Sequence, residues 1–383
     1  MRTTVSIGIL GCGTVGGGVA ELLLRERRLI ESRSAVNFQV AAIAVHSLDK
    51  SRPPGIPSEL FTTNAAALID DPTIDVIVEC IGGVNEAREL VERALERGKH
   101  IVTANKDLIA TEGPRLFALA ASTRASIHYE AAVCSAVPIV RVLKDSLAGE
   151  DILEVSGVLN GTANFILSAM HAGQSYERAL LDAQRLGFAE ADPSGDIDGV
   201  DAAHKLAILC QLAFRTAITS RRIARTGISA VTPEAVAVAH RQGYAVKLLG
   251  LARKTVSGLS AEIGPAFVPL DHPFAQPKGP ENCVRVVGRA AGSLFFSGLG
   301  AGREPSASAV VGDIIETLRS IGARHATAAL APAVAVEPAF YQFNHIQVSA
   351  VRYPVWRDIT DLPHLTKETT HDDHARTHGA AAF

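Results

Sequence analysis

The stretch VSIGILGCGTVG, residues 5–16, decides the fold of the first part of the chain. An apolar run typical of a buried strand leads into the pattern Gly11-x-Gly13-x-x-Gly16, and a helical pattern follows. In a strand–turn–helix unit these glycines serve the tight turn, the close approach of a pyrophosphate and the packing of helix on strand. The helix N-terminus then offers N–H groups and a partial positive charge to phosphates. We therefore predict a dinucleotide site, with a purely structural turn as the alternative.

Strand and helix patterns alternate up to about residue 135. The expected strands are 5–10, 38–45, 75–79, 101–103 and 127–129, and the expected helices are 15–27, 86–97 and 112–122. Strands separated by helices of this length predict a parallel, doubly wound sheet.

From about residue 150 runs of helices and runs of strands replace the alternation. We expect strands at 152–159, 246–252, 260–268 and 283–287, helices at 163–170, 175–186, 199–214 and 233–241, and a glycine-rich turn at 298–302 before a helix at 306–321. This order predicts an α+β domain whose mixed sheet is covered by helices on one side. The polar stretch 366–383 predicts a disordered tail, although its His371, His374 and His378 leave metal binding as the alternative.

The composition narrows the function classes. With 47% hydrophobic and 20% charged residues, the chain of 383 residues reads as an ordinary globular protein of two domains. A net charge of −3 gives no electrostatic footprint for nucleic acid. No apolar run is long enough to span a bilayer, and we read no signal peptide at the start. Five scattered cysteines favour reduced thiols in the cytoplasm over a disulfide framework or zinc site: Cys12, Cys80, Cys134, Cys210 and Cys283.

The end of the second expected strand bears on the choice of cofactor. An NAD-selective site carries an acidic residue about twenty residues beyond the glycines, to hold the ribose 2′-hydroxyl. This chain has His46 and Ser47 at that point, with Lys50 and Arg52 nearby to meet a 2′-phosphate. We therefore favour NADP, while Asp49 keeps NAD open and a plain solvated loop is the other alternative.

Two segments place polar residues where a ligand crevice is expected. Lys106 follows the fourth strand, and in an open α/β sheet the carboxyl ends of strands face the ligand. Thr162, in the segment GVLNGTANFIL (157–167), could cap a helix whose first N–H groups could bind a carboxylate. A surface lysine and plain helix capping are the alternatives.

The segment GFAEADPSGDIDGVDAAHKLAIL, residues 187–209, joins an acidic loop to an apolar helix. Asp201 and Lys205 are four residues apart and share a face of that helix. They could form a weak surface ion pair. Because the helix is largely apolar it should be buried, and buried charges that need one another often mark active sites.

Together these segments resemble homoserine dehydrogenases over nearly the whole ordered length. The matching text, in family order, is GILGCGTVG, VECIGGVNEA, GKHIVTANKDLIA, YEAAV, GVLNGTANFIL, LGFAEADPSGDIDGVDAAHKLAIL, GPENCV and GLGAGREPSASAVVGDI. The acidic loop with its helix is the most specific of these. The resemblance implies an α/β fold, a Rossmann dinucleotide-binding domain plus an α+β catalytic and dimerisation domain with a mixed sheet.

The resemblance also implies an activity and site roles. Family enzymes interconvert aspartate 4-semialdehyde and homoserine with NAD(P)H, in the biosynthesis of threonine, methionine and isoleucine. By similarity Lys205 would protonate the forming alkoxide, and Lys106 would contact cofactor and substrate. The substrate would be bound by Glu190, Asp196, Asp201, Gly161 and Thr162; the cofactor would be bound by Gly11, Cys12, Gly13, Thr14, Val15, Gly16, His46, Lys50, Arg52, Lys106, Gly187 and Gly302.

The family also has a monovalent-cation site, for an ion such as Na⁺, near its hinge. The matching positions here are the Glu130 carboxylate and the backbone of Val133, Ser135 and Val137, with local pairing of Glu130 as the alternative. The family usually has a glycine-rich stretch where this chain has Cys134-Ser135-Ala136, so backbone approach is more restricted here.

We expect a dinucleotide-binding domain at 1–135 completed by 299–325, a catalytic and dimerisation domain at 136–298, and a partly disordered extension at 326–383. The resemblance implies a homodimer acting on a small-molecule substrate, without nucleic-acid or membrane partners. We find no pattern of a threonine-sensing ACT domain and expect weak or absent inhibition by threonine. Another Rossmann dehydrogenase, a dinucleotide-sensing regulator and an inactive paralogue are the competing hypotheses.

Overall fold

The structure is a computed structural model that describes residues 4–256 and 258–322. The predicted extension 326–383, with its tail at 366–383 and the three histidines, lies outside the described residues. Within the described ranges no helix combines the length and apolar character needed to cross a membrane.

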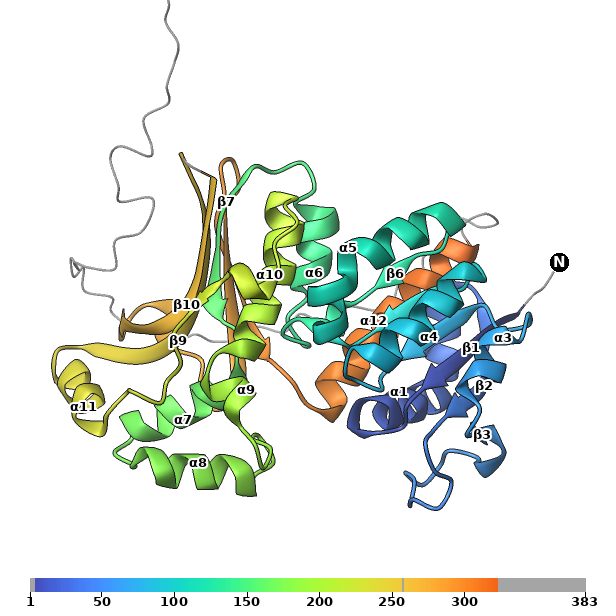
Figure 1. Ribbon diagram of the computed structural model, residues 1–383, viewed down its shortest axis with the longest axis horizontal. Coiled ribbons are helices and arrows are strands. Elements are labelled where there is room, and N and C mark those ends of the chain that lie inside the picture. Colours follow the sequence, from blue (N-terminus) through green and yellow to red (C-terminus); the bar gives the residue numbers. More distant parts are fainter. Residues whose placement is uncertain (1–3, 257, 323–383) are drawn as a thin grey trace, which may run out of the picture. The chain divides into compact units, whose positions relative to one another are not determined.

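The first sheet has six parallel strands in the order β3-β2-β1-β4-β5-β6 (Figure 1). Their bounds are β1 Thr4–Leu10, β2 Asn37–Ala44, β3 Phe61–Thr62, β4 Val76–Glu79, β5 His100–Thr103 and β6 Ile127–His128. This is the strand order of a Rossmann sheet, in which the order of the strands reverses between the neighbouring β1 and β4. The predicted α/β fold with a parallel sheet is confirmed.

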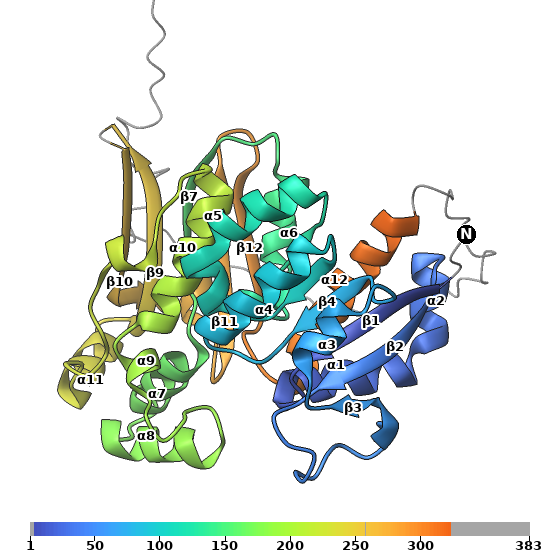
Figure 2. The same ribbon diagram turned by 45° about the vertical axis from the view of Figure 1, so that its right-hand side comes forward.

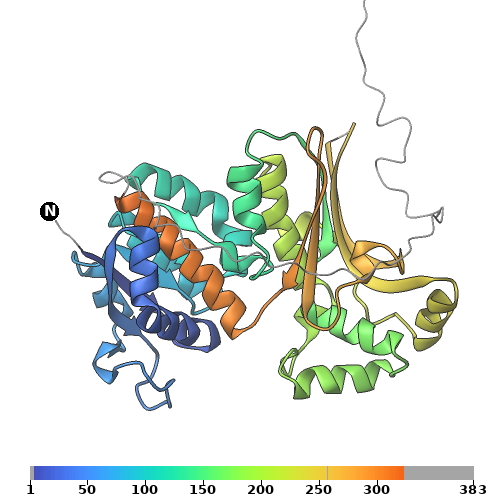
Figure 3. The ribbon, with the colours of Figure 1, turned by 180° about the vertical axis from the view of Figure 1, so that it is seen from behind.

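Helices cover both faces of this sheet. They are α1 Thr14–Arg25, α2 Arg27–Ser34, α3 Ala65–Asp70, α4 Asn85–Glu96, α5 Lys106–Thr123 and α12 Arg303–Gly322. Helix α12, orange in Figure 3, lies beside the blue α1, and their apolar side chains share one core with β1 and β2. The chain thus returns to the first sheet after building the second.

Local differences from the sequence-based expectation have simple causes. The helix expected at 15–27 is two helices, because Glu26 departs from helical backbone geometry (φ −99°, ψ 19°). Helix α5 begins at Lys106, six residues before its expected start, and it carries Pro114 in its interior. The two-residue β3 and the short α3 were not expected at all, since segments this short show no periodicity.

The second sheet is mixed, with the order β12-β11-β7-β9-β10-β8. Its strands are β7 Ile152–Val158, β8 Ala224–Arg225, β9 Tyr244–Thr255, β10 Gly258–Pro269, β11 Glu281–Gly288 and β12 Gly292–Leu299. The β8–β10 pair is parallel and the other pairs are antiparallel. The sequence patterns do not predict strand β12, whose last two residues fall within the glycine-rich turn expected at 298–302.

Among the residues that the structure describes, five helices accompany this sheet: α7 Gly161–His171, α8 Tyr176–Arg185, α9 Ser194–Ile197, α10 Val200–Phe214 and α11 Pro233–Arg241. Figure 2 shows α10 and α7 near the strands, and both contact β9. The sheet residues Val155, Val284 and Val286 share a core with Leu206 and Leu209 of α10. This apolar contact buries most of α10, as its composition predicts.

Residues 130–146 connect the two sheets. They form a 3-10 turn at Glu130–Ala132, the single-turn helix α6 at Ile139–Arg141 and a π-helical turn at Val142–Ser146. Asp313 of α12 accepts a hydrogen bond from the Glu130 N–H (2.8 Å) and one from the Arg141 guanidinium (3.0 Å). The connection is therefore fastened to the returning helix.

Candidate functional site

The glycine loop between β1 and α1 borders a cleft of about 440 Å³. Gly11 has a φ of +92°, and a Cβ there would lie 2.7 Å from the Cys80 carbonyl oxygen. A Cβ on Gly16 would lie 2.1 Å from the Gly11 carbonyl oxygen, whereas a Cβ on Gly13 would meet nothing within 4 Å. Helix α1 begins without a side-chain cap at Gly13. Tight glycine packing behind an open, uncapped helix start suits a pyrophosphate.

The far end of this cleft is lined by the four residues proposed for the 2′-phosphate choice: His46, Ser47, Lys50 and Arg52. The Arg52 guanidinium donates hydrogen bonds to the carbonyls of Ser47 (2.5 Å) and Cys12 (3.3 Å). These bonds hold a cation between the strand end and the glycine loop. Glu86 is the single carboxylate among the described residues that line the cleft.

The loop after β4 forms the opposite wall and is organised by Glu79, whose side chain is fully buried. Its carboxylate accepts hydrogen bonds from the N–H groups of Ile81 (2.9 Å) and Gly82 (3.2 Å) and from the Thr103 hydroxyl (2.6 Å). Burial raises the pKa of Glu79. The VECIGG segment alone does not reveal this role of Glu79, because it depends on Thr103 in the next strand.

A second cleft, of about 660 Å³, brings most of the other predicted residues together. Those lining it are Lys106, Gly161, Thr162, Gly187, Glu190, Asp196, Asp201, Lys205 and Gly302. They come from helices that accompany both sheets, from the loop between α8 and α9, and from the glycine turn before α12. Of the predicted cofactor residues, Thr14, Val15 and Gly16 line neither cleft and lie in the first turn of α1.

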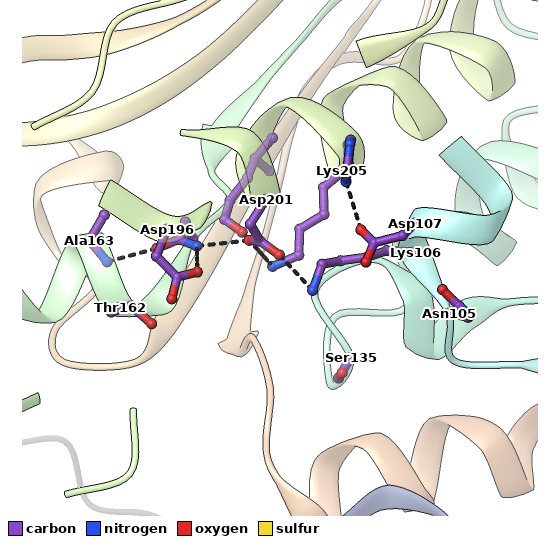
Figure 4. A network of polar contacts seen from close by, with 12 residues as sticks. Asn105, Lys106, Asp107, Ser135, Thr162, Ala163, Asp196, Asp201 and Lys205 are labelled. Atoms are coloured by element: carbon purple, nitrogen blue, oxygen red, sulfur yellow. Dashed lines mark hydrogen bonds and ion pairs between the residues drawn. The ribbon is translucent and has the colours of Figure 1, made fainter. Parts of the chain in front are cut away.

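Two lysines share one carboxylate in this cleft (Figure 4). The Asp201 Oδ1 lies 2.9 Å from the Lys106 Nζ, and its Oδ2 lies 2.8 Å from the Lys205 Nζ. Lys205 also donates to the Leu159 carbonyl (2.9 Å). The side chains of Asp201 and Lys205 are 10% and 9% exposed and that of Lys106 is 37% exposed, so the surface ion pair considered from the sequence is excluded.

The charges of this triad stabilise one another. Burial would raise the pKa of the Asp201 carboxyl, but the two ammonium groups outweigh it and hold the pKa well below its usual range. The Asp201 charge in turn raises the pKa of Lys106. The triad therefore places two lysines around one carboxylate, while Glu190, Asp192 and Asp196 add further carboxylates to the lining of the same cleft.

Asn160 connects the triad to Asp196. Its Nδ2 donates to the Asp196 Oδ1 (2.6 Å) and to the Asp201 Oδ2 (2.8 Å), while its Oδ1 accepts from the Ala163 N–H (2.7 Å). Asn160 is thus the cap of α7, and the expectation that Thr162 caps this helix is wrong. The Thr162 hydroxyl instead donates to the Phe188 carbonyl (2.7 Å) and ties α7 to the acidic loop. Asparagine is among the best capping residues, so the sequence offered a signal for Asn160.

A second pair joins the same two helices as the lysine triad. The His204 Nδ1 lies 2.7 Å from the Asp107 Oδ1, and both residues line the cleft. This hydrogen bond lowers the pKa of Asp107. Asp107 directly follows Lys106, and His204 directly precedes Lys205. The pair therefore fixes α5 against α10 beside the two lysines. Sequence reasoning missed this pair, because 97 residues separate its members.

The predicted cation ligands lie in the connection between the sheets, and none of them lines either cleft. Both carboxylate oxygens of the buried Glu130 accept backbone N–H groups, from Val140 (2.9 Å) and Arg141 (2.8 Å). The Val137 carbonyl accepts from the Ile139 N–H (2.7 Å). Cys134 has a φ of +53°, the left-handed conformation in which a glycine would be unstrained. Glu130 is therefore paired with neighbouring backbone N–H groups, as the alternative to a cation site expected.

Known families match both halves of the chain. The family model described as "Homoserine dehydrogenase, NAD binding domain" matches residues 11–130, and the one described as "Homoserine dehydrogenase" matches residues 138–315. The homoserine dehydrogenase of Mycobacterium tuberculosis strain H37Rv is 38% identical over 395 residues, covering 98% of this chain and 89% of that protein. The Synechocystis enzyme is 42% identical, covering 86% of this chain and 77% of that protein.

Solved structures agree with these relatives. A homoserine dehydrogenase from Thiobacillus denitrificans has a TM-score of 0.80 and 43% identity, covering 84% of this chain and 74% of that one. A hyperthermophilic archaeal homoserine dehydrogenase in complex with NADPH has a TM-score of 0.70 and 27% identity, covering 82% of this chain and 97% of that one. The chain therefore belongs to the homoserine dehydrogenase family, oxidoreductases that reduce aspartate semialdehyde to homoserine.

Proposed function

We propose that Lys205 is the proton donor of this reaction and that Lys106 assists it at the junction of cofactor and substrate. The observation that carries the proposal is the Lys106–Asp201–Lys205 triad, buried on one side and open to the second cleft on the other. A bound nicotinamide supplies the hydride that reduces the aldehyde carbon. Negative charge then develops on the substrate oxygen, and an ammonium group held in place both stabilises that charge and delivers a proton.

The remaining residues of the cleft suit the two ends of an amino acid. Asp196 and Glu190 supply carboxylates for the substrate ammonium group, and burial raises the pKa of Asp196. The first turn of α7 begins at Gly161 and Thr162, where a helix has no internal acceptors for its N–H groups. These N–H groups and the positive end of the helix suit the substrate carboxylate.

Replacing Lys205 by Met tests the proton donor. We expect kcat for homoserine oxidation at alkaline pH to fall about 1000-fold, because general acid–base groups contribute factors of this order. NADPH affinity, measured by fluorescence titration, should change by less than about threefold, since Lys205 is absent from the nucleotide cleft. Lys254→Met, which removes a surface ion pair with Asp151, is the matched control and should behave like the parent. A normal kcat in Lys205→Met would remove Lys205 from this role.

We also propose that the chain prefers NADP over NAD. The support is electrostatic, because His46, Lys50 and Arg52 line the end of the nucleotide cleft where a 2′-phosphate would lie. Asp49 is the acidic residue nearest this point in the sequence, and it is absent from the lining of the cleft. The preference rests on these side chains together, and it is measured as the ratio of kcat/KM for the two cofactors.

A monovalent cation at the connection is a further proposal, made by Glu130 with the backbone of Val133, Ser135 and Val137. The oxygen-rich donor set suits a hard cation, and each hydrogen-bonded oxygen keeps a second lone pair. Comparing thermal midpoints in sodium and choline chloride at equal ionic strength tests it, because a bound ion stabilises the folded state.

We also propose a division into three parts: a dinucleotide-binding domain at 1–135 with 299–325, a catalytic domain at 136–298, and an extension at 326–383. A cytoplasmic location and a homodimer are further proposals. For the dimer, the support is the exposure of Phe295 (40%) and Leu299 (44%) on β12, the strand at one edge of the second sheet. Sedimentation of the purified chain measures its assembly.

A further inference from the structure

The motif GPENCV, residues 279–284, has no function in the site as described so far. It begins in a loop and continues into β11. Pro280 lines the second cleft together with Gly161 and Gly302, so this loop touches both the start of α7 and the glycine turn. What holds the loop in place therefore bears on the shape of the cleft.

The contact between this loop and α7 is made by backbone. A Cβ on Gly161 would lie 2.8 Å from the Pro280 carbonyl oxygen and 3.2 Å from its Cα. The Gly300 N–H donates to the same Pro280 carbonyl (3.3 Å). Pro280 is thus wedged between the first residue of α7 and the turn that leads to α12, and a shift of the loop would move both.

Behind the loop lie two buried polar side chains, Asn164 of α7 and Lys247 of β9, which are 0% and 4% exposed. The Asn164 Nδ2 lies within hydrogen-bond distance of the carbonyls of Pro277 (3.2 Å), Gly279 (2.9 Å) and Glu281 (3.3 Å). The Lys247 Nζ donates to the Asn164 Oδ1 (2.8 Å) and to the Pro277 carbonyl (2.6 Å). One ammonium group and one amide therefore gather the carbonyls of segment 277–281.

The buried ammonium group of Lys247 contributes little to the stability of the fold, so its presence calls for another explanation. Burial lowers the pKa of Lys247 to about 8, and these two hydrogen bonds go to neutral oxygens. A buried ammonium without a hydrogen-bonded carboxylate is a poor way to stabilise a fold. It is, however, an effective way to fix several carbonyl groups at one point, because the ammonium and the Asn164 amide offer donors in several directions.

We propose that Lys247 and Asn164 are positioning residues that hold segment 277–281 against Gly161 and so fix the first turn of α7 for the substrate carboxylate. The inference rests on the proposed binding of that carboxylate at α7. It predicts an effect on homoserine binding larger than that on cofactor binding. Pro280 packs directly on Gly161, whereas a single hydrogen bond of 3.3 Å links it to the glycine turn.

One variant at each residue tests the Lys247–Asn164 pair, which we call the brace. Lys247→Met removes the ammonium group at similar length, and Asn164→Asp keeps an acceptor for Lys247 while removing the donors to the loop. In both we expect KM for homoserine to rise about tenfold, with kcat and the NADPH dissociation constant changed by less than about threefold. Lys254→Met, on the same strand and paired at the surface with Asp151, is the control with unchanged KM.

The outcomes separate a positioning role from a structural one. An unchanged KM in both variants overturns the proposal. So does a parallel loss of homoserine affinity, NADPH affinity and thermal midpoint, which would make the pair mere scaffold. If Lys247→Met does not fold, Asn164→Asp decides alone, since it keeps the ammonium paired. The proton-donor proposal fails separately, because it is read from kcat in Lys205→Met and the brace is read from KM.

Discussion

The cleft at the end of β1 is shaped mainly by backbone atoms, whereas the cleft between α5 and α10 is shaped mainly by charged side chains. The first is shaped by backbone: Gly11 and Gly16 leave no room for a side chain, and Gly13 opens onto the cleft. The second is shaped by charged side chains, with Asp201 shared by two lysines that come from different helices. A backbone cradle is encoded by a few adjacent residues, whereas a charge network is encoded by residues far apart. The two clefts should therefore respond differently to pH and to mutation.

The largest expected effect concerns Lys247, the buried charged residue behind the loop that borders the second cleft. Burial lowers the Lys247 pKa from 10.5 to about 8, so between these values the folded chain binds fewer protons than the unfolded chain. Its cost to stability is full below about pH 8 and is relieved as pH rises to 10.5. Relative to Lys247→Met, the parent should gain about 3 kcal/mol over this window, as 1.36 kcal/mol per pKa unit requires.

Urea unfolding of both proteins at about pH 7.5 and about pH 10.5 measures this difference, and the comparison with the variant removes the contribution of lysines that do not interact with Lys247. A difference between parent and variant that stays constant with pH would contradict the lowered pKa. Over the same interval Gly13→Ala should track the parent, because it adds no ionisable group to the nucleotide cleft.

The second prediction separates two functions of glycine in the backbone cradle. Gly16→Ala puts a Cβ against the Gly11 carbonyl, so NADPH affinity should fall about 100-fold and the thermal midpoint should drop, since overpacking costs 1–3 kcal/mol. In Gly13→Ala the added methyl group meets no protein atom. That variant should lose NADPH affinity while keeping its thermal midpoint. Equal stability losses in both variants would mean that the glycines serve folding alone.

The smallest expected effect lies where side chains enter the nucleotide cleft. Arg52→Ala should lower kcat/KM for NADP about tenfold, because a hydrogen bond to a charged group contributes about 1.5–3 kcal/mol. With NAD the same variant should change little. Arg25→Ala, at the end of α1, provides an exposed control. If NAD and NADP suffer equally, Arg52 supports the loop through Ser47 and Cys12 and does not read the phosphate.

The same contrast explains how much the sequence could predict. The strands, the glycine loop and the apolar α10 follow from patterns within a dozen residues, and the structure agrees with them. The two-residue β3 and the edge strand β12 carry too little local signal. In the site, the i,i+4 spacing indicated Asp201 and Lys205. The Asp107–His204 pair and the Glu79–Thr103 bond depend on how helices and strands pack, which no single segment encodes.

The two hydrogen bonds of the Asn105 side chain limit how the cofactor site of this enzyme can be redesigned. Its side chain caps α5 at Leu108 (3.0 Å) and donates to the Gly83 carbonyl (2.6 Å), so the loop after β4 and the helix that begins with Lys106 are held by one amide. A substitution of Arg52 leaves this amide untouched, because Arg52 bonds to the carbonyls of Ser47 and Cys12. Substitutions in the 80–83 loop would disturb the Asn105 hydrogen bond to Gly83. A loop redesigned for another cofactor would therefore also displace Lys106 at the start of α5.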